Sequence, residues 1–293
     1  MDFLQPTTWG EALEAKAAHP DAVPVAGGTD VMVGINFGHL RPSLLMDLTR
    51  IDDLQQWSTE DGTVRLGAGV TYARVISELG DRLPGLAMAS RTIGSPQIRN
   101  RGTVGGNLAT ASPAGDAHPA LLAADAVVEV ASVRGSRRIP ITDFYTGVKR
   151  NAMDADELIA AVLITPPSGP QQYSKIGTRN AMVISVAAFG LALHPVRGAV
   201  GTGIGSAAPT PRRAGAAEEF LAGELADAGL WESRAELPAE TAGRFGELVA
   251  GAASPIDDVR GSARYRLHSL SVMARRALTW AWTDYRTEAA KGV

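Results

Sequence analysis

The sequence predicts an α+β protein of two domains, and three observations lead to this prediction. The first half mixes short β-branched segments with glycine turns and a helical pattern. A proline-rich stretch, T-P-P-S-G-P at residues 165–170, then interrupts the chain, because proline cannot donate a backbone hydrogen bond to a sheet or helix. Beyond it, strand-like segments give way to helical ones. We therefore expect one domain over residues 1–168 and a second over residues 169–293.

The first domain is expected to begin with a strand, a tight glycine loop and a helix turn from Pro24 onward. Two further strands are predicted at residues 44–48 and 63–70, and a helix at residues 71–79. A β-hairpin around Gly135 is predicted to pair residues 126–131 with 138–141. Thr71 is a suitable N-cap for the helix. The segment from Thr92 to Pro119 is dense in Gly, Pro, Ser and Asn and is predicted to be a long loop, which in a compact domain is usually functional.

The second domain is expected to contain strands followed by helices. The strands are predicted at residues 172–176, 183–193 and 199–205, and the helices at 214–225, 237–252 and 262–285. One apolar face of the last helix would be formed by Leu267, Leu270, Met273, Leu278 and Trp282.

Composition and charge narrow the class of protein. The chain has 293 residues, of which 45% are hydrophobic, so it can bury a sizeable core. A formal net charge of -3 gives no reason to expect nucleic acid or an anionic membrane as a partner. No signal-peptide pattern and no apolar run of about 20 residues is present, so we expect a cytoplasmic protein without a membrane span.

Cysteine and histidine usage bears on cofactors. The sequence contains no cysteine, so this chain has no thiolate to ligate zinc or an ordinary iron–sulfur cluster. Its five histidines are scattered, at positions 19, 39, 118, 194 and 268, without ligand spacing. Any iron–sulfur cluster must therefore belong to a partner, and no metal site is predicted here.

The first candidate ligand loop is Ala26-Gly27-Gly28-Thr29-Asp30. Glycines after a strand can turn successive backbone N–H groups into one concavity, which suits phosphate oxygens. An ordinary strand-to-helix turn would have the same residues, so this loop alone leaves both interpretations open.

The second candidate is Thr103-Val104-Gly105-Gly106-Asn107, followed by Ser112-Pro113-Ala114-Gly115-Asp116. The glycine pair permits close approach by backbone donors, and the polar side chains supply the donors and acceptors that a pyrophosphate with ribose or ribityl hydroxyls requires. A structural loop capped by Asn107 and Asp116 is the alternative. No P-loop, Rossmann fingerprint or nucleophile elbow is present.

Both loops, V-A-G-G-T-D and I-R-N-R-G-T-V-G-G-N-L-A-T-A-S-P-A-G-D, resemble the paired FAD motifs of molybdenum hydroxylase flavoprotein subunits. This family includes xanthine dehydrogenase and carbon monoxide dehydrogenase. Segments at 173–181, 205–213 and 255–266 resemble the family too, so the likeness extends over nearly the whole chain. It implies a two-lobed FAD-binding domain of the vanillyl-alcohol-oxidase type, followed by a small C-terminal α+β domain with an antiparallel sheet and helices.

The resemblance also implies FAD-binding residues, position by position. Pro24, Val25, Ala26, Gly27, Gly28, Thr29, Asp30 and Val31 would wrap the pyrophosphate, and Thr103, Gly105, Gly106 and Asn107 would meet it from the other side, with Ser112 nearby. Asp116 would hydrogen-bond the flavin nucleotide, Ile93 would lie near the ring, and Ile159 and Lys175 would occupy flavin-contacting positions. For Lys175, an exposed strand lysine is an equal alternative.

The family resemblance further implies a division of labour among subunits. A large partner would hold the molybdenum cofactor, a small partner would carry two [2Fe–2S] clusters, and this chain would carry FAD and pass electrons to NAD or another acceptor, within a dimer of heterotrimers. Xanthine-dehydrogenase-type subunits are the most similar, and subunits of carbon monoxide or N-heterocycle dehydrogenases are alternatives. A self-contained FAD oxidoreductase and a scaffold with a decayed flavin site are further alternatives.

Overall fold

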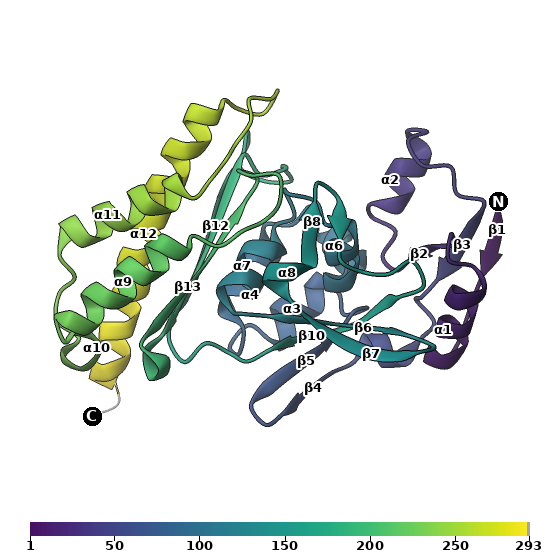
Figure 1. The fold of residues 1–293 in the computed structure, drawn as a ribbon, viewed down its shortest axis with the longest axis horizontal. Helices are drawn as coiled ribbons and strands as arrows, with labels where there is room; N and C mark the ends of the chain where they lie inside the picture. Colours follow the sequence, from purple (N-terminus) through teal and green to yellow (C-terminus); the bar gives the residue numbers. More distant parts are fainter. Residues whose placement is uncertain (292–293) are drawn as a thin grey trace.

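The computed structural model describes residues 1–291, which form an N-terminal lobe, a second lobe and a C-terminal domain (Figure 1). The N-terminal lobe and the C-terminal domain lie at opposite ends, with the second lobe between them. None of the helices in this described part of the chain combines the length and the apolar character needed to cross a bilayer. The mixed helix and sheet architecture confirms the predicted α+β class.

The N-terminal lobe is a small parallel sheet with two helices. Its elements are β1 (Asp2–Leu4), α1 (Trp9–Ala18), β2 (Val23–Val25), α2 (Val31–Asn36) and β3 (Leu44–Asp47). The strands pair in the order β1-β3-β2, so the predicted strand over 44–48 is the central one. The loop between β2 and α2 therefore leaves the sheet at the carboxyl end of an edge strand, facing the second lobe.

The second lobe is built on a five-stranded antiparallel sheet in the order β4-β5-β10-β6-β7. Its strands are β4 (Trp57–Glu60), β5 (Thr63–Gly67), β6 (Val127–Ser132), β7 (Gly135–Pro140) and β10 (Leu158–Ile164). The short elements α8 (Ile141–Phe144), β8 (Tyr145–Gly147) and β9 (Arg150–Asn151) follow the β6–β7 hairpin. The helix predicted over 71–79 is present as α3 (Tyr72–Glu78), with Thr71 as its N-cap. The predicted hairpin around Gly135 is also confirmed.

The prediction of one long loop from Thr92 to Pro119 was wrong. Three short helices form there, α5 (Pro96–Arg101), α6 (Val104–Thr110) and α7 (Ala117–Ala123), after α4 (Pro84–Arg91). Ser95 and Thr103 cap the first two by accepting hydrogen bonds from the N–H groups of Ile98 and Gly106. Side-chain caps and tertiary packing thus override the low helix propensity of glycine, proline and asparagine in this segment.

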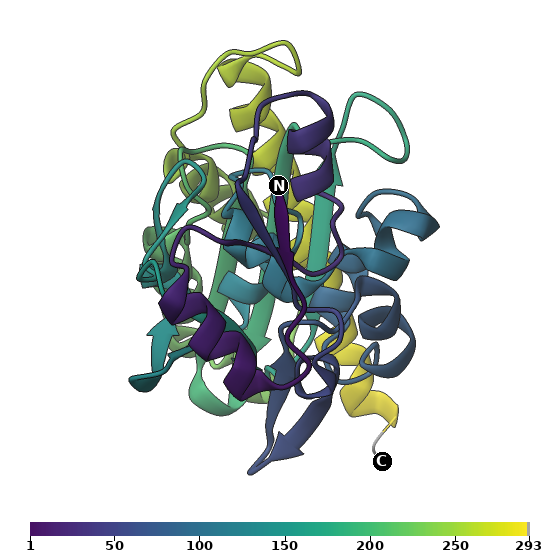
Figure 2. The same cartoon turned by 90° about the vertical axis from the view of Figure 1, so that its right-hand side faces the viewer.

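The C-terminal domain packs a three-stranded antiparallel sheet against helices. Its elements are β11 (Gln171–Ile176), β12 (Ala187–His194), β13 (Ala199–Gly205), α9 (Gly215–Asp227), α10 (Leu230–Ser233), α11 (Ala239–Gly251) and α12 (Ala263–Lys291). One face of the sheet receives α12 and α9, and the other receives α7 of the second lobe (Figure 1). The view in Figure 2 shows the N-terminal lobe in front of this sheet. Residues 165–170 connect β10 to β11 without forming a strand or helix.

Two hydrophobic cores accompany this arrangement. One lies in the lobes and extends to Tyr173 and Ala188, and the other lies between the C-terminal sheet and its helices. The division at residue 168 coincides with the segment that joins the two, and it stays a prediction.

Candidate FAD site

Three cavities surround the loop between β2 and α2, where the N-terminal lobe faces the second lobe. We name them cavity A (about 390 Å³), cavity B (about 370 Å³) and cavity C (about 380 Å³). All three are lined by Ala26 and Gly27, and A and B also share Thr103, Gly106 and Ala109 of the opposite wall. The two glycine loops singled out in the sequence therefore lie face to face across one crevice.

The first glycine loop presents its backbone to the crevice. Gly28 has φ +72°, a left-handed conformation that glycine adopts without strain, and a Cβ on Gly27 would overlap the carbonyl oxygen of Arg101. Within residues 1–291, the N–H groups of Gly27, Gly28, Thr29 and Asp30 donate to no protein atom. Consecutive N–H groups that lack protein acceptors form a nest suited to an anion.

The second glycine loop works differently from the prediction. The N–H of Val104 donates to Val70 O (3.2 Å), that of Gly105 to Ala68 O (3.1 Å) and that of Gly106 to Thr103 Oγ1 (3.0 Å). These backbone donors are used inside the protein, so they do not face a ligand. The N-terminal half of α6 instead presents exposed Gly106, which has no side chain. Outside the neighbouring backbone of its own helix, Thr103 Oγ1 is the only atom of the described residues within 4 Å of where a Cβ at Gly106 would be.

Buried polar atoms at cavity B point to a polar ligand or ordered water. The Tyr72 hydroxyl and Asn107 Oδ1 are buried and have no hydrogen-bond partner in the described structure, and both residues line cavity B. Burial raises the pKa of Tyr72 well above that of an exposed tyrosine, so its hydroxyl stays protonated and available as a donor. A buried donor and acceptor without partners are costly unless a ligand or water satisfies them.

Asp116 and Lys175 form a buried ion pair instead of lining the crevice. Lys175 Nζ lies 2.6 Å from Asp116 Oδ2, and each side chain is only 9% exposed. Lys175 also donates to the carbonyl oxygens of Thr92 (3.0 Å) and Val183 (3.1 Å), and Asp116 Oδ1 accepts hydrogen bonds from Tyr173 (3.2 Å) and Ser185. The alternative of an exposed strand lysine is therefore wrong. Through its hydrogen bond to Thr92 O, the Lys175 of this pair fixes the backbone directly before Ile93, which lines cavity B.

The remaining predicted residues divide between the cavities. Ile93 lines cavity B and Ile159 lines cavity A, so they would meet different parts of one extended ligand. Pro24 borders A and B, Val25 borders C, and Thr29, Asp30 and Val31 border B. Ser112 borders none of the three; its Oγ accepts from the N–H of Ala114 (3.3 Å) and stabilises the turn before α7.

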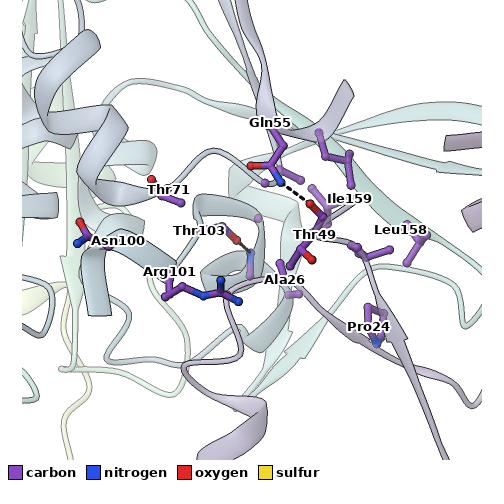
Figure 3. Close-up of a pocket in the computed structure, with 18 of the residues that line it drawn as sticks. Pro24, Ala26, Thr49, Gln55, Thr71, Asn100, Arg101, Thr103, Leu158 and Ile159 are labelled. Carbon is purple, nitrogen blue, oxygen red and sulfur yellow. Dashed lines mark hydrogen bonds between the residues drawn. The ribbon is translucent and has the colours of Figure 1, made fainter. Parts of the chain in front are cut away.

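Several lining residues were missed by the sequence reasoning. Cavity A is bordered by Thr49, Gln55 and Arg101, whose side chains are drawn in Figure 3. Gln55 Nε2 donates to Thr49 O at 3.0 Å, which fixes the polar edge of an otherwise apolar cavity. Only Arg101 had a usable sequence signal, a cation directly before the second glycine loop. Groups of His, Cys, Asp and Glu able to hold a metal ion are absent from the described residues.

A crevice between two α+β lobes fits an extended dinucleotide when one wall presents a nest for an anion and the other presents a helix surface without a side chain at Gly106. Residues 1–167 match the family described as the FAD binding domain in molybdopterin dehydrogenase, which makes the chain a flavoprotein. Residues 172–281 match the C-terminal domain of carbon monoxide dehydrogenase flavoproteins. The chain belongs to the FAD-binding subunits of the molybdenum hydroxylase family, and its cofactor is FAD.

Curated relatives and solved structures agree with this membership. The nicotine 6-hydroxylase medium subunit of Paenarthrobacter nicotinovorans is 32% identical over 95% of this chain and 96% of that protein. The xanthine dehydrogenase FAD-binding subunit of Escherichia coli O157:H7 is 30% identical over 95% of each. Quinoline 2-oxidoreductase from Pseudomonas putida 86 superimposes with a TM-score of 0.87 at 25% identity, covering 98% of both chains. A Cu,Mo-containing carbon monoxide dehydrogenase gives 0.87 at 28% identity, covering 97% of this chain and 98% of that one.

Proposed function

We propose that this chain is the FAD-carrying electron-transfer subunit of a molybdenum hydroxylase of the xanthine-dehydrogenase type. Its [2Fe–2S] and molybdenum partners would be separate chains. The observation that carries the proposal is the nest at residues 27–30, which faces exposed Gly106 across the crevice. Relatives that act on purine or pyridine rings support an N-heterocyclic substrate, since their names include xanthine, caffeine and nicotine. A carbon monoxide dehydrogenase flavin subunit is the alternative, favoured by the structural likeness and by the family match of residues 172–281.

The chain's own residues would bind and orient the cofactor. The nest would hold the pyrophosphate, and the absence of a side chain at Gly106 would let it approach α6. Cavity A, with Met153, Leu158 and Ile159 on its walls, suits the adenine, and cavity B, with Ile93 and the Tyr72 hydroxyl, suits the flavin ring. When bound, FAD supplies a carrier that takes electrons from a partner's clusters and delivers a hydride to an acceptor.

A fourth cavity supports NAD, or another anionic molecule, as that acceptor. This cavity, of about 770 Å³, is lined by Arg91, Arg99 and Arg179 and by Lys175, whose charge is paired with Asp116, and no acidic residue lines it within the described structure. Residues 92–94 separate it from cavity B, because Thr92 and Gly94 border the one and Ile93 the other. An anionic acceptor held there would lie one turn of chain away from the proposed ring position. Cytoplasmic location, the two partner subunits and a dimer of heterotrimers stay predictions.

The test is the flavin content of the purified chain. We expect one FAD per chain, held non-covalently, because the sequence contains no cysteine and the two histidines that flank the first glycine loop, His19 and His39, lie at the end of α1 and beyond α2. Acid precipitation should release the flavin into the supernatant. Flavin that stays with the precipitated protein would contradict non-covalent binding, and a chain that binds no FAD would contradict the proposed function itself.

A further inference from the structure

At the junction of the two glycine loops lies Arg101, a cation that has no side-chain partner in the described part of the chain. It is exposed, and within residues 1–291 its guanidinium makes no hydrogen bond or ion pair. It borders cavities A and C, and it is the only lysine or arginine among the described residues that line A, B or C. Figure 3 shows its side chain extending from the end of α5 towards Ala26.

The backbone fixes where this side chain starts. A Cβ at Gly27 would overlap the Arg101 carbonyl oxygen, so the main chain of Arg101 lies directly against the nest. The N–H of the next residue, Gly102, donates to Ile98 O at 2.6 Å and closes the last turn of α5. The Arg101 side chain therefore starts beside the loop of residues 27–30 and borders the cavities on both sides of Gly27.

The acidic residues around the crevice would repel a bound pyrophosphate, and a nearby cation would offset that repulsion. Asp30 borders cavity B and Asp47 borders cavity C, so two carboxylates flank the place where a doubly negative pyrophosphate would lie. Neutral N–H groups alone would leave that anion near two like charges. A guanidinium offers five donors in a planar fork that matches phosphate oxygens, which an ammonium group does not.

We propose that Arg101 binds the pyrophosphate of FAD directly and offsets the repulsion from Asp30 and Asp47. The inference rests on the crevice being the FAD site, and it adds a charged contact that the glycine loops by themselves do not provide. It also assigns the residue that makes the site prefer pyrophosphate-containing ligands over nucleosides.

The experiment measures FAD binding by the flavin-free chain for Arg101→Ala, Arg101→Lys and the control Arg276→Ala. Arg276 is another exposed arginine, on α12, whose side chain makes no hydrogen bond or ion pair in the described structure. Loss of a charge-assisted contact should weaken FAD binding by about ten- to a hundredfold in Arg101→Ala, with a smaller loss in Arg101→Lys. Arg276→Ala should bind FAD like the wild type.

Competition by ADP and by adenosine separates a phosphate contact from a general defect. In the wild type, ADP should displace FAD better than adenosine does, and this preference should shrink in Arg101→Ala by the same factor as FAD affinity. An unchanged preference for ADP over adenosine would overturn the proposal whatever happens to total affinity, as would FAD affinity within about twofold of wild type. A wild-type chain that fails to bind FAD would instead refute the proposed function.

Discussion

At the scale of single residues, the glycines of the crevice differ in what lies beside them. A Cβ at Gly105 would lie 2.5 Å from the Ala68 Cβ and 2.6 Å from the Ala68 carbonyl oxygen, which belongs to rigid backbone. A Cβ at Gly106 would meet only Thr103 Oγ1, at 3.0 Å, and would otherwise enter the crevice. Of these neighbouring glycines, Gly105 is therefore needed for packing, whereas Gly106 leaves space open in the crevice.

This difference predicts opposite outcomes for the two glycines. Gly106→Val should abolish FAD binding while the flavin-free chain keeps most of its thermal stability, because the new side chain fills space needed by the cofactor. Gly105→Val should lower the melting temperature of the flavin-free chain itself, since its Cβ clashes with Ala68. Stoichiometric FAD in Gly106→Val would show that α6 is not the pyrophosphate wall.

His118 is a second residue with a measurable consequence. Its side chain is fully buried, Nδ1 lies 2.7 Å from the Tyr145 hydroxyl, and Nε2 has no partner in the described structure. Burial lowers the pKa of His118 from 6.5 to about 3, so the folded protein holds it neutral. Its contribution to stability is therefore complete above pH 6.5 and is lost as the pH falls towards 3.

Urea unfolding of wild type and His118→Asn checks this dependence. Asparagine can keep an acceptor near Tyr145 but does not titrate. Between about pH 6 and pH 4 the wild type should lose up to about 1.4 kcal/mol of unfolding free energy per pH unit relative to the variant. Parallel pH profiles for the two proteins would mean that His118 titrates normally in the folded state.

From the residues alone, without the family resemblance that pointed to Ile93 and Ile159, the candidate site was predictable only where residues form a local motif. Both glycine loops could be found because their glycines follow a strand or a cap at short range. Thr49, Gln55 and Tyr72 could not, since they reach the crevice through the packing of separate elements and have no local signature. Asp116 and Lys175 were identified, but their pairing with each other, across the two domains, follows only from the tertiary structure.

At the scale of elements, regular patterns were predictable and tertiary context was not. The hairpin around Gly135 and the long helix α12 have clear periodicity, and both are present. Strand β10 was missed, although it is central in its sheet, because its run L-I-A-A-V-L-I is apolar throughout and lacks the alternation of a half-buried strand. The segment from Thr92 to Pro119 was taken for a loop because capping of very short helices outweighs composition there.

The glycines of β13 illustrate an element-level role. Gly201, Gly203 and Gly205 alternate along the strand and face α7, where a Cβ would clash with Ala123 or Pro119. Their spacing of two residues is therefore a packing feature of a strand, which explains why G-T-G-I-G is no nucleotide fingerprint. Because these three glycines have no side chains, α7 lies directly on the C-terminal sheet.

Alanine substitutions at a glycine of β13 and at a glycine of α11 should distinguish a packing role from an effect on helix propensity. Gly203→Ala should cost about 1–3 kcal/mol of unfolding free energy, because the methyl group meets the Pro119 backbone. Gly243→Ala, inside α11 with nothing within 4 Å of its Cβ position, should instead gain about 0.5–1 kcal/mol. Denaturant titration of both variants measures the unfolding free energies. Equal changes in unfolding free energy would refute the packing role of the β13 glycines against α7.

At the scale of the whole molecule, the second lobe and the C-terminal domain are joined by packing and by charge. Helix α7 lies on β12 and β13, and the Asp116–Lys175 pair connects its N-cap to β11. A second connection runs from Asp125 of the second lobe to Arg197 and Arg213 of the C-terminal domain. Lys175 also lines the fourth cavity, so its ion pair with Asp116 connects a wall of that cavity to the second lobe.

The central claim is that this chain carries FAD but receives its electrons from partner subunits. The most direct test adds xanthine or another N-heterocycle, without oxygen, to the purified FAD-containing chain and follows flavin absorbance. We expect no bleaching with the chain alone and prompt bleaching once the molybdenum and iron–sulfur subunits are added. Substrate-dependent bleaching of the isolated chain would contradict the account and identify a self-contained oxidoreductase.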